Sequence, residues 1–215
     1  MKKFMFLASA FLLIIGLVST SSALPLVNGN FDDTTGISLA DGGWAVFESI
    51  PGWTSGTGTS GIEIQYNTIV DAHSPNFYVE LDSHNGTDTN SSMHQDVTLE
   101  TGSYELSFWY HARTNNSGDD NGIRALIGGT LIGSVSELAT NQPDVWEEIT
   151  WNFTIADGGE YALAFAAFGK DNSLGGFIDS VSLNATPVPE PATMLLLGTG
   201  LVGLAGIGRK KFFNK

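Results

Sequence analysis

The sequence predicts an all-β protein, a two-sheet antiparallel β-sandwich that lies between two apolar chain ends. Two observations predict this fold. In the middle of the chain, hydrophobic residues alternate with polar ones at a period of two, and Gly, Asn, Asp and Pro separate the alternating segments. No segment there sustains the period of 3.6 residues that an amphipathic helix requires. We therefore expect eight to ten strands packed in two layers.

The alternation is clearest in residues 103–113. Tyr104, Leu106 and Phe108 alternate there with polar residues, as a half-buried antiparallel strand requires. The residues 157–159, Asp-Gly-Gly, predict a tight hairpin. The other expected strands cover residues 62–66, 77–81, 93–99, 123–132, 146–155, 161–168 and 177–183.

The amino-terminal end predicts a signal peptide. Lys2 and Lys3 precede a charge-free apolar segment, residues 4–18, and small residues lead up to Ala23. The segment is shorter than the roughly 20 residues of a stable spanning helix. We therefore expect residues 1–23 to form a signal helix that is cleaved after Ala23.

The carboxy-terminal end repeats this pattern in reverse. Residues 192–207 are uncharged and apolar, and Arg209, Lys210 and Lys211 follow them. As a helix they would reach about 24 Å, which is less than the roughly 30 Å of a bilayer core. We expect a marginal transmembrane helix with its basic tail, residues 208–215, on the cytoplasmic side. The middle domain then comprises residues 24–186, and the terminal segment comprises residues 187–215.

The start of this terminal segment carries a resemblance. Val188, Pro189, Glu190 and Pro191 stand directly before the apolar helix and the basic cluster. This order of parts resembles the PEP-CTERM sorting signal of Gram-negative bacteria that make exopolysaccharide. The resemblance implies transient insertion in the inner membrane. It also implies cleavage by an exosortase near the Pro-Glu-Pro and delivery to the cell surface or the extracellular space. An ordinary tail anchor is the alternative.

Charge excludes one class of partner. Residues 24–187 hold 22 acidic residues and three basic ones, Arg113, Arg124 and Lys170, which gives a net charge of −19. Such a surface repels the phosphate backbone, so no nucleic-acid partner is expected. The chain has no cysteine, which excludes disulfides and thiolate metal sites.

Four segments of the middle domain resemble the galactose-binding-like jelly rolls, which include carbohydrate-binding modules. They are residues 26–32, 50–53, 102–108 and 177–183. Many of these domains hold a structural Ca²⁺ between the first and last strands, and the resemblance assigns that role to Asp32 and Asp179. Two carboxylates with backbone carbonyls suit this ion. The alternative is that Asp32 accepts hydrogen bonds from a turn and Asp179 from a bulge. Residues 115–122 are acidic too, but we interpret them as a solvated turn.

The alternation in residues 103–113 also predicts a ligand site. Trp109, His111 and Arg113 share the face opposite the core residues. A tryptophan ring can stack on a sugar, while the other two side chains offer polar contacts. The alternative is a strand buried on both faces, on which Trp109 is packed.

No catalytic pattern stands out in the sequence. The four histidines have no metal-ligand spacing, and Glu147 and Glu148 are neighbours on a strand and so point to opposite faces. We expect a non-catalytic β-sandwich, exported to the cell surface or extracellular matrix, that binds polysaccharide there. A structural matrix or adhesion protein without a sugar site and a carbohydrate-active hydrolase remain as alternatives.

Overall fold

The computed structural model describes residues 22–24, 26–57, 59–84, 90–113, 122–136, 145–186 and 196–201. Residues Ser21–Thr186 form one compact unit. Near the carboxy terminus, residues 196–201 are helical. Residues 1–21 of the expected signal helix, the sorting residues Pro189, Glu190 and Pro191 and most of the expected transmembrane helix lie outside the described residues, whereas Ser22 and Ala23 belong to a strand and not to a helix. Within the described part of the chain, no helix has the length and apolar character to cross a membrane.

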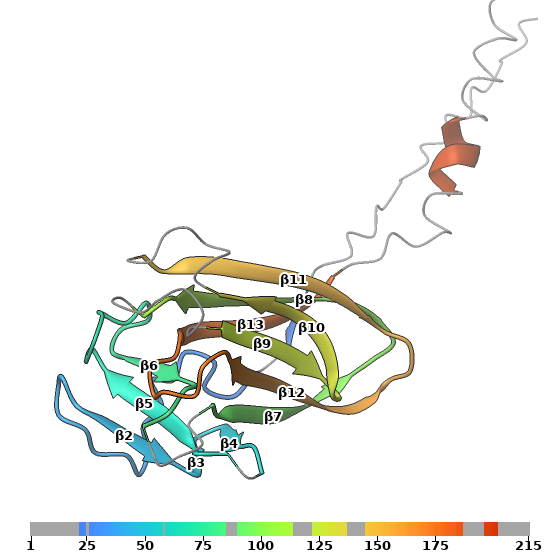
Figure 1. Ribbon diagram of the computed structural model, residues 1–215. Helices are drawn as coiled ribbons and strands as arrows, with labels where there is room; N and C mark the ends of the chain where they lie inside the picture. Colours follow the sequence, from blue (N-terminus) through green and yellow to red (C-terminus); the bar gives the residue numbers. More distant parts are fainter. Residues whose placement is uncertain are drawn as a thin grey trace, which may run out of the picture. The chain divides into compact units, whose positions relative to one another are not determined.

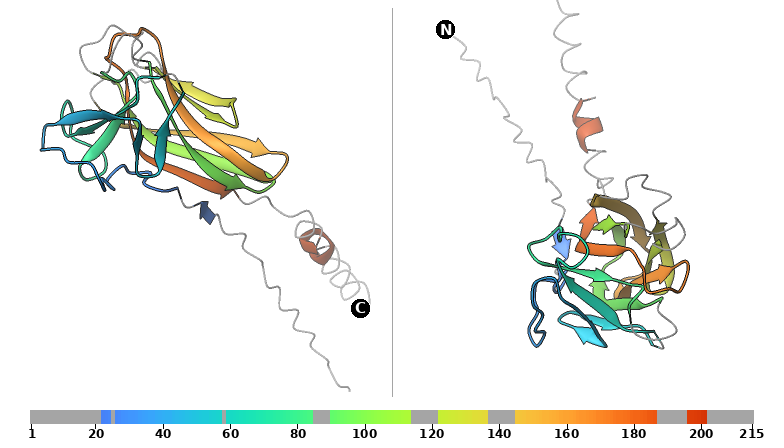
Figure 2. Two further views of the ribbon diagram at one scale, coloured as in Figure 1. Left: turned by 90° about the horizontal axis from the view of Figure 1, so that it is seen from below. Right: turned by 60° about the vertical axis from the view of Figure 1, so that its left-hand side comes forward.

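The compact unit is an antiparallel sandwich of two sheets, which confirms the predicted fold class (Figures 1 and 2). Sheet A has the order β11-β8-β13-β6-β5-β2, with β1 paired to β13, and sheet B has the order β10-β9-β12-β7-β4-β3. The strands of sheet A are β1 (Ser22–Leu24), β2 (Trp44–Phe47), β5 (Ile62–Tyr66), β6 (Phe77–Glu80), β8 (Gly102–His111), β11 (Glu147–Ile155) and β13 (Phe177–Thr186). Those of sheet B are β3 (Ser49–Ile50), β4 (Trp53–Ser55), β7 (Ser92–Leu99), β9 (Gly122–Ile127), β10 (Thr130–Val135) and β12 (Gly159–Phe168).

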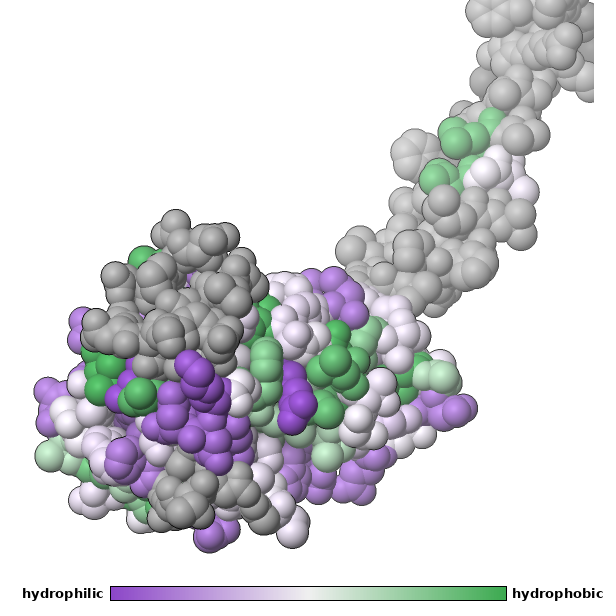
Figure 3. All heavy atoms as spheres, viewed as in Figure 1, coloured by the Kyte–Doolittle hydropathy of each residue, from purple (hydrophilic) through white to green (hydrophobic). Residues whose placement is uncertain are grey.

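The hydrophobic core lies between the two sheets. Alternate residues of each long strand point into it because successive side chains of a strand point to opposite faces. Phe108 of β8 and Phe165 of β12 meet there edge to face, with ring centroids 5.2 Å apart. By contrast, the surface shown in Figure 3 mixes hydrophilic and hydrophobic side chains. The largest fully buried side chains include Trp53, Tyr78, Tyr110, Phe31, Phe108, Phe165 and Phe177.

Two turns differ from their prediction. Residues 123–132 form not one strand but the hairpin of β9 and β10, because Gly128 and Gly129 both adopt positive φ, 53° and 81°. Two consecutive residues with positive φ make the tight turn that matches the twist of a two-residue hairpin. The Asp157-Gly158-Gly159 turn does not make a hairpin. It joins β11 of sheet A to β12 of sheet B.

A backbone hydrogen bond joins the loop around Gly29 to β13, the last strand of the sandwich. The amide of Val181 donates a 2.8 Å hydrogen bond to the carbonyl of Gly29. A β-carbon on Gly29 would lie 2.3 Å from the carbonyl oxygen of Val181, so a glycine is required here. The register of β13 shifts between Asp179 and Ser182, and Ser180 adopts a φ of 51° at this bulge. The contact brings the loop that carries Asp32 to the bulge that carries Asp179.

Candidate functional site

Strand β8 divides its side chains between the core and the outer face of sheet A, the face that points away from sheet B. Leu106 and Phe108 are fully buried in the core, and Tyr104 nearly so. Trp109, His111 and Arg113 share the opposite face, as the alternation predicts. The same face receives Glu148 of β11 beside Trp109.

Part of this outer face is buried although it lies outside the core. Tyr78, Glu80, Phe177 and Asp179 have no exposed surface. Two loops supply hydrogen-bond donors to Tyr78 and Glu80. Ile69 and Val70 donate backbone hydrogen bonds to the Tyr78 hydroxyl, and Gly175 donates one to Glu80. We call this part, formed by β5, β6 and the first residues of β13, the covered half of sheet A.

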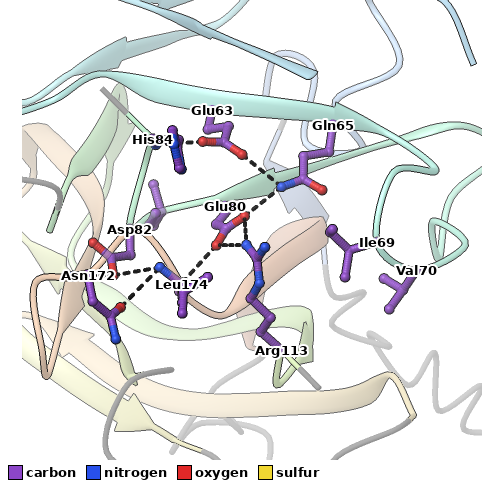
Figure 4. A network of polar contacts seen from close by, with 12 residues as sticks. Glu63, Gln65, Ile69, Val70, Glu80, Asp82, His84, Arg113, Asn172 and Leu174 are labelled. Carbon is purple, nitrogen blue, oxygen red and sulfur yellow. Dashed lines mark hydrogen bonds and ion pairs between the residues drawn. The ribbon is translucent and has the colours of Figure 1, made fainter. Parts of the chain in front are cut away.

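A buried ion pair lies at the centre of the covered half (Figure 4). The guanidinium Nη1 of Arg113 is 2.6 and 2.8 Å from the two carboxylate oxygens of Glu80. Gln65 donates from its amide nitrogen to both Glu63 and Glu80, at 2.8 and 2.5 Å. The Tyr78 hydroxyl in turn donates to the carbonyl oxygen of Gln65. The network therefore links β5, β6, β8 and both covering loops.

The two carboxyls of this network raise an electrostatic problem. Burial and the neighbouring carboxylate of Glu63 raise the pKa of Glu80 to about 8, although Arg113 and the Gly175 amide act in the opposite direction. Burial also raises the pKa of Tyr78. Arg113 is the cation that faces Glu80, and its side chain is 19% exposed. Removing one partner of such a buried pair is expected to destabilise the fold by about 3–5 kcal/mol.

The raised pKa of Glu80 predicts how stability depends on pH. Below about pH 8 the folded protein holds Glu80 protonated, so Arg113 donates to a neutral carboxyl there and forms an ion pair with Glu80 only above that pH, whereas the unfolded chain releases the proton near the ordinary pKa of 4.5. Between about pH 5 and pH 8 the folded state thus binds more protons than the unfolded state. The contribution of Glu80 to the free energy of unfolding therefore falls as the pH rises through this range. Urea unfolding across this range should show that decrease, and Glu80→Gln should remove it. Glu148→Gln, on the exposed end of the same sheet face, is the matched control and should keep the decrease; a decrease that persists in Glu80→Gln contradicts the assignment.

Aromatic rings cover the boundary of this half. The ring of His73 stacks on Trp109 with centroids 3.8 Å apart and planes 13° apart. Trp146 meets His111 edge on at 5.3 Å, and its indole N–H donates to the carbonyl of Asp71. His111 is buried, and Arg113 is engaged by Glu80. Of the three predicted ligand residues, Trp109 is thus the one at the border of the exposed surface, with its ring stacked by His73.

Beyond Trp109 the same face is open. Three neighbouring strands, β11, β8 and β13, present cross-strand rows of small polar side chains there. All nine side chains are half-buried or exposed, and one of them is ionisable. We call this surface the open half of sheet A. Its rows are Thr150-Ser107-Ser182, Asn152-Glu105-Asn184 and Thr154-Ser103-Thr186.

The predicted metal ligands Asp32 and Asp179 both contact residues 74–76. Asp179 accepts from the Ser74 amide at 2.7 Å and from the Ser180 amide, and Asp32 accepts from the Asn76 amide at 3.3 Å. Burial raises the pKa of Asp179, while the Ser74 and Ser180 donors oppose the shift. These hydrogen bonds are the ones that the alternative to calcium binding predicts, in which Asp179 accepts a hydrogen bond from the bulge at Ser180.

The Ser74 hydroxyl lies among four oxygen atoms. Its hydroxyl lies 2.8 and 3.0 Å from the Asp179 carboxylate oxygens, 2.9 Å from the Asn30 carbonyl and 3.4 Å from the Phe77 carbonyl. One hydroxyl proton cannot serve four oxygen atoms, and oxygen atoms are the ligands that the predicted calcium would need. The described residues contain no group of three His, Asp or Glu side chains that would hold a metal. Calcium here would therefore use hydroxyl and backbone oxygens beside Asp32 and Asp179.

Calcium at this site remains a prediction, and heat denaturation tests it. Millimolar calcium should raise the melting temperature of the exported protein, because a cation bound to the folded state alone stabilises that state. Asp179→Asn should abolish the rise, and Asp96→Asn, an exposed aspartate on sheet B, should keep it. A melting temperature that is the same in calcium and in chelator would contradict calcium binding and would mean that Asp32 and Asp179 only accept hydrogen bonds.

Sequence reasoning missed the partners of Arg113. Glu63 and Glu80 each follow an apolar residue in a strand, and that pattern indicates an exposed face rather than a buried charge. Their pairing depends on β6 lying between β5 and β13, which no local pattern shows. The acidic residues 115–121 lie outside the described residues.

Comparison with known proteins gives the clearest result at the carboxy terminus. The PEP-CTERM protein-sorting motif matches residues 187–210. The chain carries a PEP-CTERM sorting motif. This confirms the resemblance noted for residues 188–191 and the segment that follows. No curated protein matches the chain.

Solved structures resemble the sandwich. An apo cyclase from Fischerella sp. is 15% identical, with a TM-score of 0.57 over 80% of this chain and 99% of its own. A Stig cyclase, FisC from Fischerella sp. TAU, in complex with (3Z)-3-(1-methyl-2-pyrrolidinylidene)-3H-indole, is 13% identical, with a TM-score of 0.58 over 79% and 100%. A family 35 carbohydrate binding module from Clostridium thermocellum is 15% identical over 77% and 98%, but its TM-score is 0.39, which is too low to support an argument. At these identities the likeness to the cyclases shows the fold alone.

Proposed function

We propose that this protein is exported, processed by an exosortase at its PEP-CTERM motif, and binds polysaccharide with the open half of sheet A. The observation that carries the binding of polysaccharide is the set of three cross-strand rows beyond Trp109. The protein acts outside the inner membrane, at the cell surface or in the extracellular matrix, and catalyses no reaction there.

The open half supports binding to a sugar chain because of its chemistry and the regular spacing of its side chains. Neighbouring strands lie about 4.8 Å apart, so hydroxyl and amide groups recur at short, regular intervals across the three strands. Ser, Thr and Asn both donate and accept hydrogen bonds, as sugar hydroxyls do. β11 is the last strand of sheet A, so the surface ends at an edge of the sheet. A long, hydroxyl-rich polymer can lie along such a face.

Trp109 adds an apolar contact at one end of the open half. It faces Glu148 on β11 and Asp179 on β13, in the row next to Thr150, Ser107 and Ser182. The His73 ring fixes the indole by stacking on it. An aromatic ring held in place loses little freedom when a sugar packs against it. The His73 ring covers one face of the indole, so a sugar would contact the part of Trp109 that stays exposed at the border of the open half.

The covered half supports a structural rather than a catalytic role. Its carboxyls are engaged by Arg113, Gln65 and backbone amides, and Glu80 has no exposed surface. A catalytic carboxyl must reach the reacting atoms of a substrate. The cyclases that share the fold do not alter this proposal, because one fold hosts many activities.

A glycan array with the exported protein tests sugar binding. We expect binding to neutral polysaccharides, and a loss of about tenfold or more with Trp109→Ala and with Asn152→Ala, because each removes a contact from the proposed surface. Thr54→Ala, an exposed residue of sheet B, is the control and should bind normally. Absence of binding to every neutral glycan would instead support a structural matrix protein without a sugar site. Turnover of a glycan substrate would instead support the alternative that the protein is a carbohydrate-active hydrolase.

The sorting step predicts the mass of the mature protein. Exosortase cleavage near Pro189-Glu190-Pro191 should remove the apolar helix and the basic tail, so the extracellular protein should lack residues 192–215. Intact-mass spectrometry of protein from the culture medium and cell surface measures this. Alanine substitution of Pro189, Glu190 and Pro191 should leave the tail attached and the protein in the membrane fraction. An extracellular protein that ends at Lys215 contradicts the assignment.

A further inference from the structure

A second candidate site lies on the other sheet. On the outer face of sheet B, a hollow of about 330 Å³ opens where β12 runs between β7 and β9. This volume falls at the lower end of the range of small-molecule sites, about 300–1,000 Å³. On the face shown in Figure 3, small, strongly hydrophilic spots lie among pale and hydrophobic side chains over β9 and β12. The residues that line the hollow are Thr59, Asn90, Ser91, Ser92, Arg124, Ala166, Ala167, Phe168 and Gly169.

Arg124 is the charged residue of this lining. It lies opposite Ala166 of β12 and Ser134 of β10 and is exposed. Among the described residues, its guanidinium has no hydrogen bond or ion pair. The small side chain of Ala166 leaves the space beside the guanidinium free. An exposed guanidinium with free donors can bind a carboxylate through two parallel hydrogen bonds.

The charge of the domain makes Arg124 unusual. Residues 24–187 contain three basic residues among 22 acidic ones. Arg113 is paired with Glu80, and Lys170 also has an interaction partner. Asp171 accepts a hydrogen bond from the amide of Asn90, a residue of the lining, at 3.1 Å. Arg124 is therefore a cation at a hollow on an otherwise strongly acidic domain.

The rest of the lining suits a sugar ring. Thr59, Ser92 and Asn90 supply hydroxyl and amide groups, and Phe168 supplies an aromatic ring. Phe168 packs over Gly122, where a β-carbon would come within 2.5 Å of the ring, so this glycine sets the place of the ring. Asn90 is held by its bond to the carbonyl of Gly169. Polar groups and one aromatic ring are what a pyranose needs for its hydroxyls and its C–H face.

We propose that this hollow binds one sugar unit of an acidic polysaccharide, with the sugar carboxylate paired to Arg124. The site is separate from the open half of sheet A, which offers no basic side chain to an anion in its three rows. The domain charge of −19 acts against every polyanion, so the pairing with Arg124 has to outweigh this repulsion. A uronic acid chain carries a single negative charge on each sugar, so one carboxylate can reach Arg124 while neutral hydroxyls meet the other lining groups. The protein would then hold a neutral chain on one sheet and an acidic chain on the other.

Isothermal titration calorimetry with tetragalacturonate tests this site on the exported protein. We expect saturable binding, a loss of about tenfold or more with Arg124→Gln, and partial retention with Arg124→Lys, which keeps the charge without the planar pair of donors. The methyl-esterified tetramer should bind as weakly as Arg124→Gln binds the acid.

Two controls separate this site from the open half. Trp109→Ala should bind tetragalacturonate normally even where it has lost a neutral glycan, and Arg124→Gln should keep neutral glycan binding. Because Arg124 is exposed, its variants should melt at the temperature of the unaltered protein. The proposal is overturned if the unaltered protein does not bind tetragalacturonate, if the ester binds equally well, or if Arg124→Gln leaves the affinity unchanged.

Discussion

Each strand of the sandwich contributes every second side chain to the space between the two sheets, and the rest of the structure depends on this constraint. Leu106 and Phe108 fill that space from β8, and Leu163 and Phe165 fill it from β12. The intervening residues then have to lie on an outer face. Function is therefore decided by what each outer face carries and by what covers it, not by the core.

The outer face of sheet A accommodates its outward-pointing side chains in two ways. Over β5 and β6, loops cover the face, and the polar residues beneath them have to satisfy one another. Arg113, Gln65 and backbone amides of the covering loops do so for Glu63 and Glu80. Buried charges of this kind cost desolvation energy, which the pairing offsets when every oxygen has a donor. Over β11, β8 and β13 no described loop covers the rows, and eight of their nine side chains are neutral.

The distribution of charge separates the two proposed binding surfaces. The open half of sheet A contains Glu105 and eight neutral polar side chains, so it offers hydrogen bonds to a neutral chain. The hollow of sheet B contains Arg124 and neutral polar groups. A sorting motif that delivers the protein to the outside of the cell is consistent with partners that are extracellular polymers.

The sequence by itself determined the fold class, the sorting motif and the direction of the β8 side chains. These features depend on local patterns: the period of two and the order of a short motif, an apolar segment and a basic cluster. Tertiary structure alone decided that Arg113 meets Glu80, that His73 stacks on Trp109 and that the turn at residues 157–159 joins two sheets. These contacts join residues 33 or more positions apart, or depend on which strands are neighbours. The physical reason is that alternation fixes the face on which a side chain lies, whereas its neighbours on that face are set by strand order and loop packing.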